Sequence, residues 1–199
     1  MRRIPLVSTL LVALAVLTML GLGVWQLQRA DQKKALLARY AAAQGLPPIA
    51  YPTLPLVEPL PFFRHATGIC LRPVGKRETA GANAAGETGY VHIVDCTTGA
   101  EGPGMSVEVG WSKDPNAKVN WNGGPVSGII VPDRRSRMRL VAATSPPGLQ
   151  PSKVPEVSSA SAVSPAGHYG YAATWFSLAV VALVIYGLAL AKRRRRETP

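Results

Sequence analysis

The chain has 199 residues and a formal net charge of +11 at pH 7, a length that suits one modest domain with additional segments. Such a charge would favour nucleic acid binding if it covered one folded face, but much of it lies at the chain ends, beside apolar segments. Residues 29–167 contain 15 basic and 10 acidic side chains, so the sequence argues against a nucleic-acid-binding protein.

The first apolar segment covers residues 4–24 and contains no charged residue. At about 1.5 Å per residue, a helix of this length spans the roughly 30 Å hydrocarbon core of a bilayer. A cleavable signal peptide has a shorter apolar region and a small-x-small cleavage site, whereas WQLQR follows here. We therefore predict an uncleaved transmembrane helix over residues 5–28, preceded by a cytoplasmic N-terminus of residues 1–4.

The second apolar segment lies between His168 and Lys192, begins with aromatic residues and ends at the basic run KRRRR. Basic flanks favour the cytoplasmic side of a membrane, and both chain ends are basic. We predict a second transmembrane helix over residues 168–191 and a basic cytoplasmic tail over residues 192–199. Both termini are then cytoplasmic, and the middle of the chain lies on the outer side of the membrane.

The middle of the chain consists of several segments that differ in amino-acid composition. We predict a helical extension (29–45), a Pro-rich connector (46–61), an outer β domain (62–148) and a flexible Pro/Ser/Ala-rich linker (149–167). Strands are expected at residues 63–71, 89–95, 105–111, 119–121, 126–131 and 138–142, and flexible loops at 75–89 and 97–104. Asn122-Gly123 is a tight-turn signal. The fold class is α+β: two transmembrane helices flank a small antiparallel β-barrel or sandwich.

The two cysteines, Cys70 and Cys96, both fall on the predicted outer side. An oxidising compartment permits a disulfide between them, while two unpaired, partly buried thiols fit the sequence equally well. The spacing alone does not decide between these alternatives, because a disulfide requires a short Cα–Cα distance.

Catalytic motifs are missing from the sequence, which has no G-x-S-x-G, no H-E-x-x-H and no phosphate-binding glycine loop. His65 and His92 are isolated in predicted strands, and an enzyme would need a cluster formed only in the fold, for instance these two histidines converging on Asp95 or Glu108. We therefore expect no enzyme activity. The densest outer charge run alternates with apolar residues, so a solvated strand face is expected; a site for an acidic partner or lipid head group is the lesser alternative. This run comprises Arg134, Arg135, Arg137 and Arg139.

The ends of the two apolar segments carry the candidate site residues. His168, Tyr171 and Trp175 share a helical face by their spacing; the histidine is either an interfacial residue or a ligand for haem iron. On the first helix, Trp25 and Arg29 share a face and either anchor the helix at the interface or meet a polar group. An amide near the hydrocarbon boundary requires a partner, so Gln26 is expected to bond a neighbouring helix or an external group.

Three stretches of this sequence resemble the surfeit locus proteins, specifically the cytochrome c oxidase biogenesis member of bacterial type. Residues 22–37 (LGVWQLQRADQKKALL) are similar to that family's G-x-W-Q-x-x-R-x-x-x-K, and residues 167–179 (GHYGYAATWFSLA) to its N-H-x-x-Y-A-x-x-W-F. Residues 107–115 (VEVGWSKDP) look like its central R-G-W. Val109 replaces the usual arginine and Gly167 the usual asparagine, so no role of that arginine is carried over.

The resemblance implies a membrane-anchored assembly factor for haem–copper cytochrome c oxidase, which assists delivery of haem A to the catalytic subunit. It implies His168 as the haem ligand. Because the predicted topology places both helix ends at one membrane surface, we expect Trp25, Gln26 and Arg29 to pack near His168, Tyr171 and Trp175 and form one site. Our hypothesis is that Arg29 contacts a haem propionate. Oxidase subunits, other assembly factors and membrane lipid are the implied partners. The implied location is the bacterial inner membrane, with a periplasmic middle domain. The alternative is a haem-free envelope scaffold whose β domain binds another membrane protein.

Overall fold

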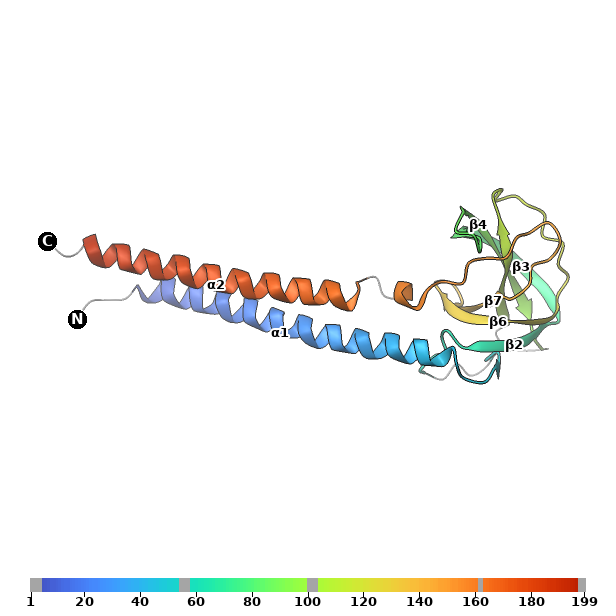
Figure 1. The fold of residues 1–199 in the computed structure, drawn as a ribbon, viewed down its shortest axis with the longest axis horizontal. Helices are drawn as coiled ribbons and strands as arrows, with labels where there is room; N and C mark the ends of the chain where they lie inside the picture. The colour runs from blue at the N-terminus through green and yellow to red at the C-terminus, as the bar shows by residue number, and fades with distance from the viewer. Residues whose placement is uncertain (1–4, 54–57, 100–103, 161–162, 197–199) are drawn as a thin grey trace. The chain divides into compact units, whose positions relative to one another are not determined.

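The computed structural model describes residues 5–53, 58–99, 104–160 and 163–196, and the chain divides into two compact units (Figure 1). One unit combines both ends of the chain, Met1–Leu36 and Ser161–Pro199, and consists of helices. The other unit, Leu37–Ala160, contains every described strand.

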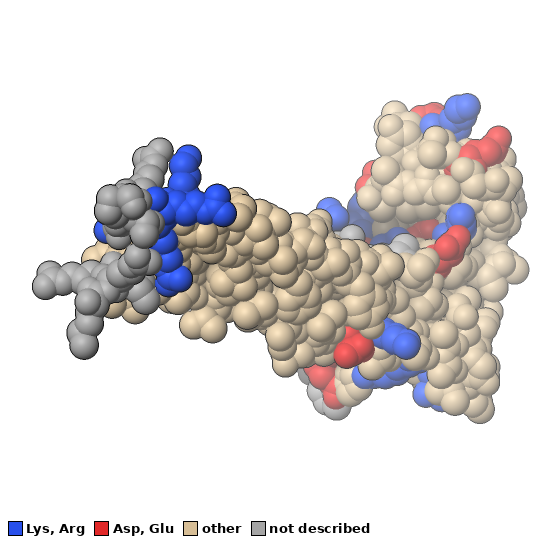
Figure 2. All heavy atoms as spheres, turned by 60° about the vertical axis from the view of Figure 1, so that its left-hand side comes forward, with Lys and Arg blue, Asp and Glu red and all other residues tan. Residues whose placement is uncertain are grey.

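Helix α1 covers Leu6–Ala43 and helix α2 covers Pro165–Arg196. By length and composition both can cross a membrane. On the face drawn in Figure 2, the helix pair shows a long stretch without Lys, Arg, Asp or Glu, with basic residues at its terminal end. Helix α2 starts three residues before the predicted boundary at 168, because Pro165 suits a first helical position and Ser164 Oγ accepts the Gly167 N–H at 3.1 Å.

A seven-residue spacing defines the contact between the helices. The three buried residues of α1 are Val16, Gly23 and Ala30, and Thr9 lies one further heptad toward the N-terminus. On α2, the same spacing connects Ala172, Ala179 and Tyr186. Thr9 Oγ1 lies 2.6 Å from Tyr186 OH, and Gly23 packs on the Phe176 ring, so the helices run antiparallel. The small residues let the helices approach closely.

A seven-stranded sheet with the order β1-β2-β6-β7-β5-β4-β3 forms the second unit. Pairs β1–β2 and β5–β7 are parallel and the remaining neighbours are antiparallel. The prediction of two terminal helices on either side of a β segment in the chain is confirmed. Of the predicted antiparallel barrel or sandwich, the barrel is not confirmed, because the sheet is mixed and open, with β1 and β3 at its edges. The strands are β1 (Ile49–Ala50), β2 (His65–Cys70), β3 (Arg72–Ala82), β4 (Thr88–Thr97), β5 (Met105–Ser112), β6 (Gly124–Asp133) and β7 (Arg137–Ala142).

A disulfide joins Cys70 of β2 to Cys96 of β4, with a Cα–Cα distance of 5.3 Å, and this decides between the two alternatives for the cysteines. In the sheet order, β2 and β4 are separated by β6, β7 and β5. The sheet must therefore curve strongly to bring the two strands together. Leu71, a bend between β2 and β3, makes a further link near the disulfide, since its N–H donates to Thr97 O of β4 at 2.9 Å.

Several local predictions are corrected by the structure. Most of the loop predicted at 75–89 forms strand β3, which pairs antiparallel with β4. No strand forms at 119–121, and the left-handed backbone of the nearby turn falls on Gly123 and Gly124 instead of Asn122-Gly123. Part of the second loop prediction, residues 100–103, lies outside the described residues. The Pro-rich connector contains β1, which pairs in parallel with β2.

The segment predicted as a flexible linker is attached to the sheet at its start. Gln150 exchanges two backbone hydrogen bonds with Trp111, at 2.7 and 2.9 Å, and the Lys153 N–H donates to Ala82 O at 2.8 Å. A short 3₁₀ helix, Val157–Ala160, follows. The prediction of a flexible segment is therefore wrong for residues 149–153, where hydrogen bonds to β3 and β5 replace the contacts with water that a linker would make.

The predicted solvated arginine face is also corrected. Arg139 Nε lies 2.6 Å from Glu108 Oε2, and Arg139 Nη1 lies 3.0 Å from Asp133 Oδ1. Asp133 also pairs with Arg77 at 2.9 Å. Burial would raise the pKa of Asp133, but hydrogen bonds from Ser136 and the charge of Arg77 outweigh it and hold this pKa below its usual value. Arg139 thus belongs to a partly buried ion-pair network, whereas Arg134 and Arg135 are exposed.

Candidate functional site

A polar pair connects the two helices where the apolar segments end. His168 Nδ1 lies 2.7 Å from Gln26 Oε1, in an interhelical hydrogen bond. Gln26 lies three residues after Gly23 and His168 four residues before Ala172, so both belong to the faces through which α1 and α2 pack. The prediction that the Gln26 amide requires a partner on a neighbouring helix is therefore met by His168.

The surroundings of His168 are close-packed on one side. The residue is 8% exposed, while Ala30 and Ala172, one helical turn from the two polar residues, are 0% and 1% exposed. These small side chains allow the close approach that a hydrogen bond between two side chains requires. Among the described residues, none hydrogen-bonds His168 Nε2, so this ring nitrogen has no protein partner there.

A second polar contact lies beside the first. Tyr169 OH donates to Asp31 Oδ1 at 3.1 Å, so two consecutive residues of α2 are bonded to α1. Sequence reasoning missed both Tyr169 and Asp31. The seven-residue spacing of Thr9, Val16 and Gly23 was the signal that could have identified the packing face and its continuation toward the polar end of the helix.

The other predicted site residues are not gathered around His168. Trp25 is 53% exposed and Tyr171 54% exposed, and both lie off the packed face of their helix. Trp175, seven residues after His168, is half-buried on the packed face. The exposed Arg29 donates from Nη1 to Gln32 Oε1 at 2.9 Å, and within the described ranges no acidic side chain pairs with it. The structure therefore brings together Gln26 and His168 but not the whole predicted set.

Of this pair, His168 is the residue that could hold a cofactor or a metal ion. In the part of the chain that the structure describes, no three His, Cys, Asp or Glu residues form a metal-binding group. A haem iron would need only one or two ligands from the protein, because the porphyrin supplies the others. A buried imidazole with one bonded and one open ring nitrogen meets that requirement.

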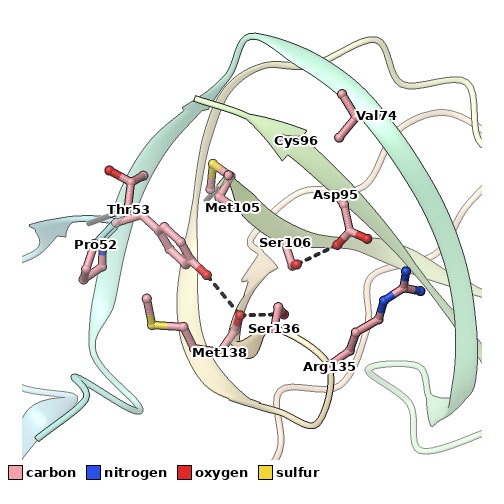
Figure 3. Close-up of a pocket in the computed structure, with 12 residues that line it drawn as sticks. Pro52, Thr53, Val74, Asp95, Cys96, Met105, Ser106, Arg135, Ser136 and Met138 are labelled. Atoms are coloured by element: carbon pink, nitrogen blue, oxygen red, sulfur yellow. Dashed lines mark hydrogen bonds between the residues drawn. The ribbon is translucent and has the colours of Figure 1, made fainter. Parts of the chain in front are cut away.

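One cavity of the β unit, of about 290 Å³, is lined by Tyr51, Met105, Met138 and neighbouring polar residues (Figure 3). Its polar groups bond one another: Tyr51 OH donates to Met138 O at 3.1 Å, and Ser106 Oγ donates to Asp95 Oδ1 at 2.6 Å. Burial raises the pKa of the Tyr51 hydroxyl. These two hydrogen bonds connect Tyr51 to β7 and β5 to β4.

The histidines of the β unit do not form a catalytic cluster. His65 is exposed on β2, whereas His92 is buried on β4, and three strands separate them in the sheet. His92 Nε2 lies 2.7 Å from Ser112 Oγ, and Glu108 is engaged by Arg139. These positions and contacts give no support to the one catalytic cluster considered from the sequence, in which His65 and His92 converge on Asp95 or Glu108.

Comparison with known proteins gives one family. The sequence model described as the SURF1 family matches residues 13–180, which include both polar helix ends and the whole sheet. No curated protein matches the chain.

Proposed function

Because the chain belongs to the SURF1 family, the surfeit locus proteins involved in cytochrome c oxidase assembly, we propose that it holds haem A at His168 during delivery to the catalytic subunit of the oxidase. The resemblance drawn from the two helix motifs is confirmed at the level of the family. Assembly of cytochrome c oxidase is the role associated with this family. Haem A handling is the finer step that the geometry of His168 supports.

The observation that carries this proposal is the hydrogen bonding and burial of the His168 imidazole. One nitrogen is bonded to Gln26 at 2.7 Å and the other has no described partner, on a residue only 8% exposed. If haem A is bound, His168 would hold it through an imidazole nitrogen, and the haem would supply the iron. Trp25, Tyr171 and Trp175 provide aromatic surface near the ends of the apolar segments. Arg29, with no acidic partner within the described ranges, provides a cation for a propionate.

The proposed location is the inner membrane of a bacterium, with both termini in the cytoplasm and the β unit in the periplasm. Two helices that can cross a membrane support anchoring, and the basic run that ends α2 supports a cytoplasmic C-terminus. The Cys70–Cys96 disulfide suits an oxidising compartment such as the periplasm. The proposed partners are the catalytic subunit, other oxidase subunits or assembly factors, and membrane lipid.

The test uses the full-length protein, purified in detergent from cells that also synthesise haem A. The expected result is a Soret band that disappears in His168→Ala and persists in His65→Ala, a matched change of an exposed histidine on β2. Unchanged haem content in His168→Ala would show that another residue holds the haem. A deletion strain with normal oxidase activity and haem A content would exclude the assembly role.

A haem-free scaffold is the second candidate. A polar pair in a helix–helix contact can serve only to fix the alignment of the helices, and the Gln26–His168 bond satisfies that role as well. Affinity co-purification separates the two candidates. Oxidase subunits together with haem support the first, and other envelope proteins without haem support the second.

A further inference from the structure

We infer that Gln26 is the positioning residue for His168: it holds the imidazole as the Nδ1–H tautomer and leaves Nε2 unprotonated. The inference starts from the two atoms that meet, His168 Nδ1 and Gln26 Oε1, 2.7 Å apart. An amide oxygen only accepts hydrogen bonds, so the proton between these atoms belongs to Nδ1. A neutral imidazole carries one N–H, and its other nitrogen then has a free lone pair.

The helix contact makes this arrangement specific to Gln26. Gln26 and Ala30 share the packed face of α1, while His168 and Ala172 share that of α2. The neighbouring Gln28, two residues along α1, is exposed and lies off this face. With Ala30 and Ala172 at 0% and 1% exposed, water has little access to the packed side of the pair. A hydrogen bond in such an environment is stronger than the same bond in water.

The tautomer determines what the ring can bind. In water, neutral histidine prefers to carry its proton on Nε2, which would turn the open nitrogen into a donor for anions and carbonyl groups. The Gln26 carbonyl reverses that preference, so the open nitrogen becomes an electron-pair donor. Histidines that bind metals usually donate their other N–H to a carbonyl or carboxylate, and Gln26 takes that place here.

This inference rests on the proposed function only for the identity of the ligand, and it deepens it. The group accepted at Nε2 is one with a vacant coordination position, such as the iron of a haem. Tyr169 and Asp31 contribute indirectly, because their 3.1 Å hydrogen bond attaches the same turn of α2 to α1. The backbone N–H of His168 is bonded to Ser164 O at 3.2 Å, which further restricts the start of the helix.

The first experiment needs no haem. Full-length protein with ¹⁵N-labelled imidazole rings is measured by NMR in detergent at a pH where histidine is neutral, and the His168 signals are identified by their loss in His168→Ala. The expected spectrum shows a protonated Nδ1 and an unprotonated Nε2. Gln26→Leu is expected to shift the proton toward Nε2, while the matched Gln28→Leu leaves the spectrum unchanged. A wild-type spectrum with the proton on Nε2, or no change in Gln26→Leu, overturns the inference.

The second experiment measures haem affinity of the same variants. Removal of such a partner of a metal-binding histidine typically weakens affinity by roughly 10–100-fold, so Gln26→Leu should show a loss of that order and Gln28→Leu none. Wild-type protein with the Nδ1–H tautomer but no haem affinity would contradict the proposed function and leave the positioning role intact. Equal haem affinity in Gln26→Leu and wild type would overturn the claim that the Nδ1–H tautomer of His168 promotes haem binding.

Discussion

Gly23 of α1 lies so close to Phe176 of α2 that a β-carbon at position 23 would come within 2.5 Å of Phe176 Cε1. Real contacts of a β-carbon are longer, so any larger side chain at position 23 must displace the ring. This contact lies three residues from Gln26 and therefore determines how closely the two helices approach at the candidate site.

Replacement of this glycine should loosen the helix pair. Gly23→Val is expected to destabilise the pair by about 1–3 kcal/mol, the usual cost of overpacking, and to lower its melting temperature in detergent. Gly21→Val is the control, because a β-carbon at Gly21 has no heavy atom within 4 Å and the gain in helix propensity is the same. Equal melting temperatures for the two variants would show that Phe176 moves aside without cost.

Arg139 is expected to be essential for the stability of the β unit. Its removal leaves Glu108, whose side chain is 2% exposed, without the cation that lies 2.6 Å from it. Arg139→Met should reduce the free energy of unfolding by about 3 kcal/mol, since an uncompensated buried charge is costly. Arg134→Met, in the same hairpin but exposed, should change it little. Chemical unfolding followed by tryptophan fluorescence measures the stability of both variants. Similar losses of stability in the two would show that the ion pairs of Arg139 do not stabilise the β unit.

The disulfide should contribute to stability because it closes a loop over a sequence separation of 26 residues. The double variant Cys70→Ala/Cys96→Ala is expected to lose about 3–4 kcal/mol, as chain-entropy models give for a loop of this size. Reducing agent should lower the melting temperature of the wild type and leave that of the double variant unchanged. A wild type that melts equally with and without reducing agent would show that the bridge is energetically neutral.

Stability should fall on mild acidification because of His92. Burial lowers its pKa, and the charges of Glu78 and Asp114 only partly oppose this effect. A histidine with a lowered pKa stabilises the fold above its ordinary pKa of about 6.5, and this contribution is lost as the pH falls from there toward the folded pKa. The free energy of unfolding should therefore be lower at pH 5.5 than at pH 7.5 in the wild type, and this difference should be smaller in His92→Gln.

The exposed His65 supplies the control for this pH dependence, and His65→Gln should retain the wild-type difference. Asp133, whose pKa is lowered, affects stability in a separate, more acidic pH range. Its contribution is complete above the ordinary carboxyl pKa of about 3.9 and disappears only below it. A His92→Gln variant with an undiminished difference between pH 7.5 and 5.5 would assign the effect to other groups.

The helices could be predicted from sequence because a long uncharged run is a local property of the chain. The sequence predicts for Gln26 only a partner on a neighbouring helix or an external group. The pairing with His168 depends on how two helices distant in sequence are aligned. Trp25 and Arg29 were placed on one face by spacing, but spacing within one helix does not say which face meets the other helix. The heptad of Thr9, Val16, Gly23 and Ala30 carries that information.

The sheet was predicted less completely. Several strands could be predicted from local patterns, but the parallel β5–β7 pair joins segments separated in the chain by strand β6, and local patterns do not reveal such a partner. Residues 75–89 were predicted as a loop because glycine is common there. In the structure, two of these glycines serve close packing: Gly81 lies against Val91, and Gly89 lies against the Trp111 ring.

The strand order has a consequence for how this domain is made during synthesis. Strands β6 and β7 lie between β2 and β5, so the latest strands of the chain occupy the middle of the sheet. Until residue 142 has left the ribosome, β2 and β5 each expose an unpaired edge. Such edges pair readily with other chains, so the newly made protein is vulnerable to aggregation until the β6–β7 hairpin inserts. Completion of the domain is thus a late event, close in time to the synthesis of α2.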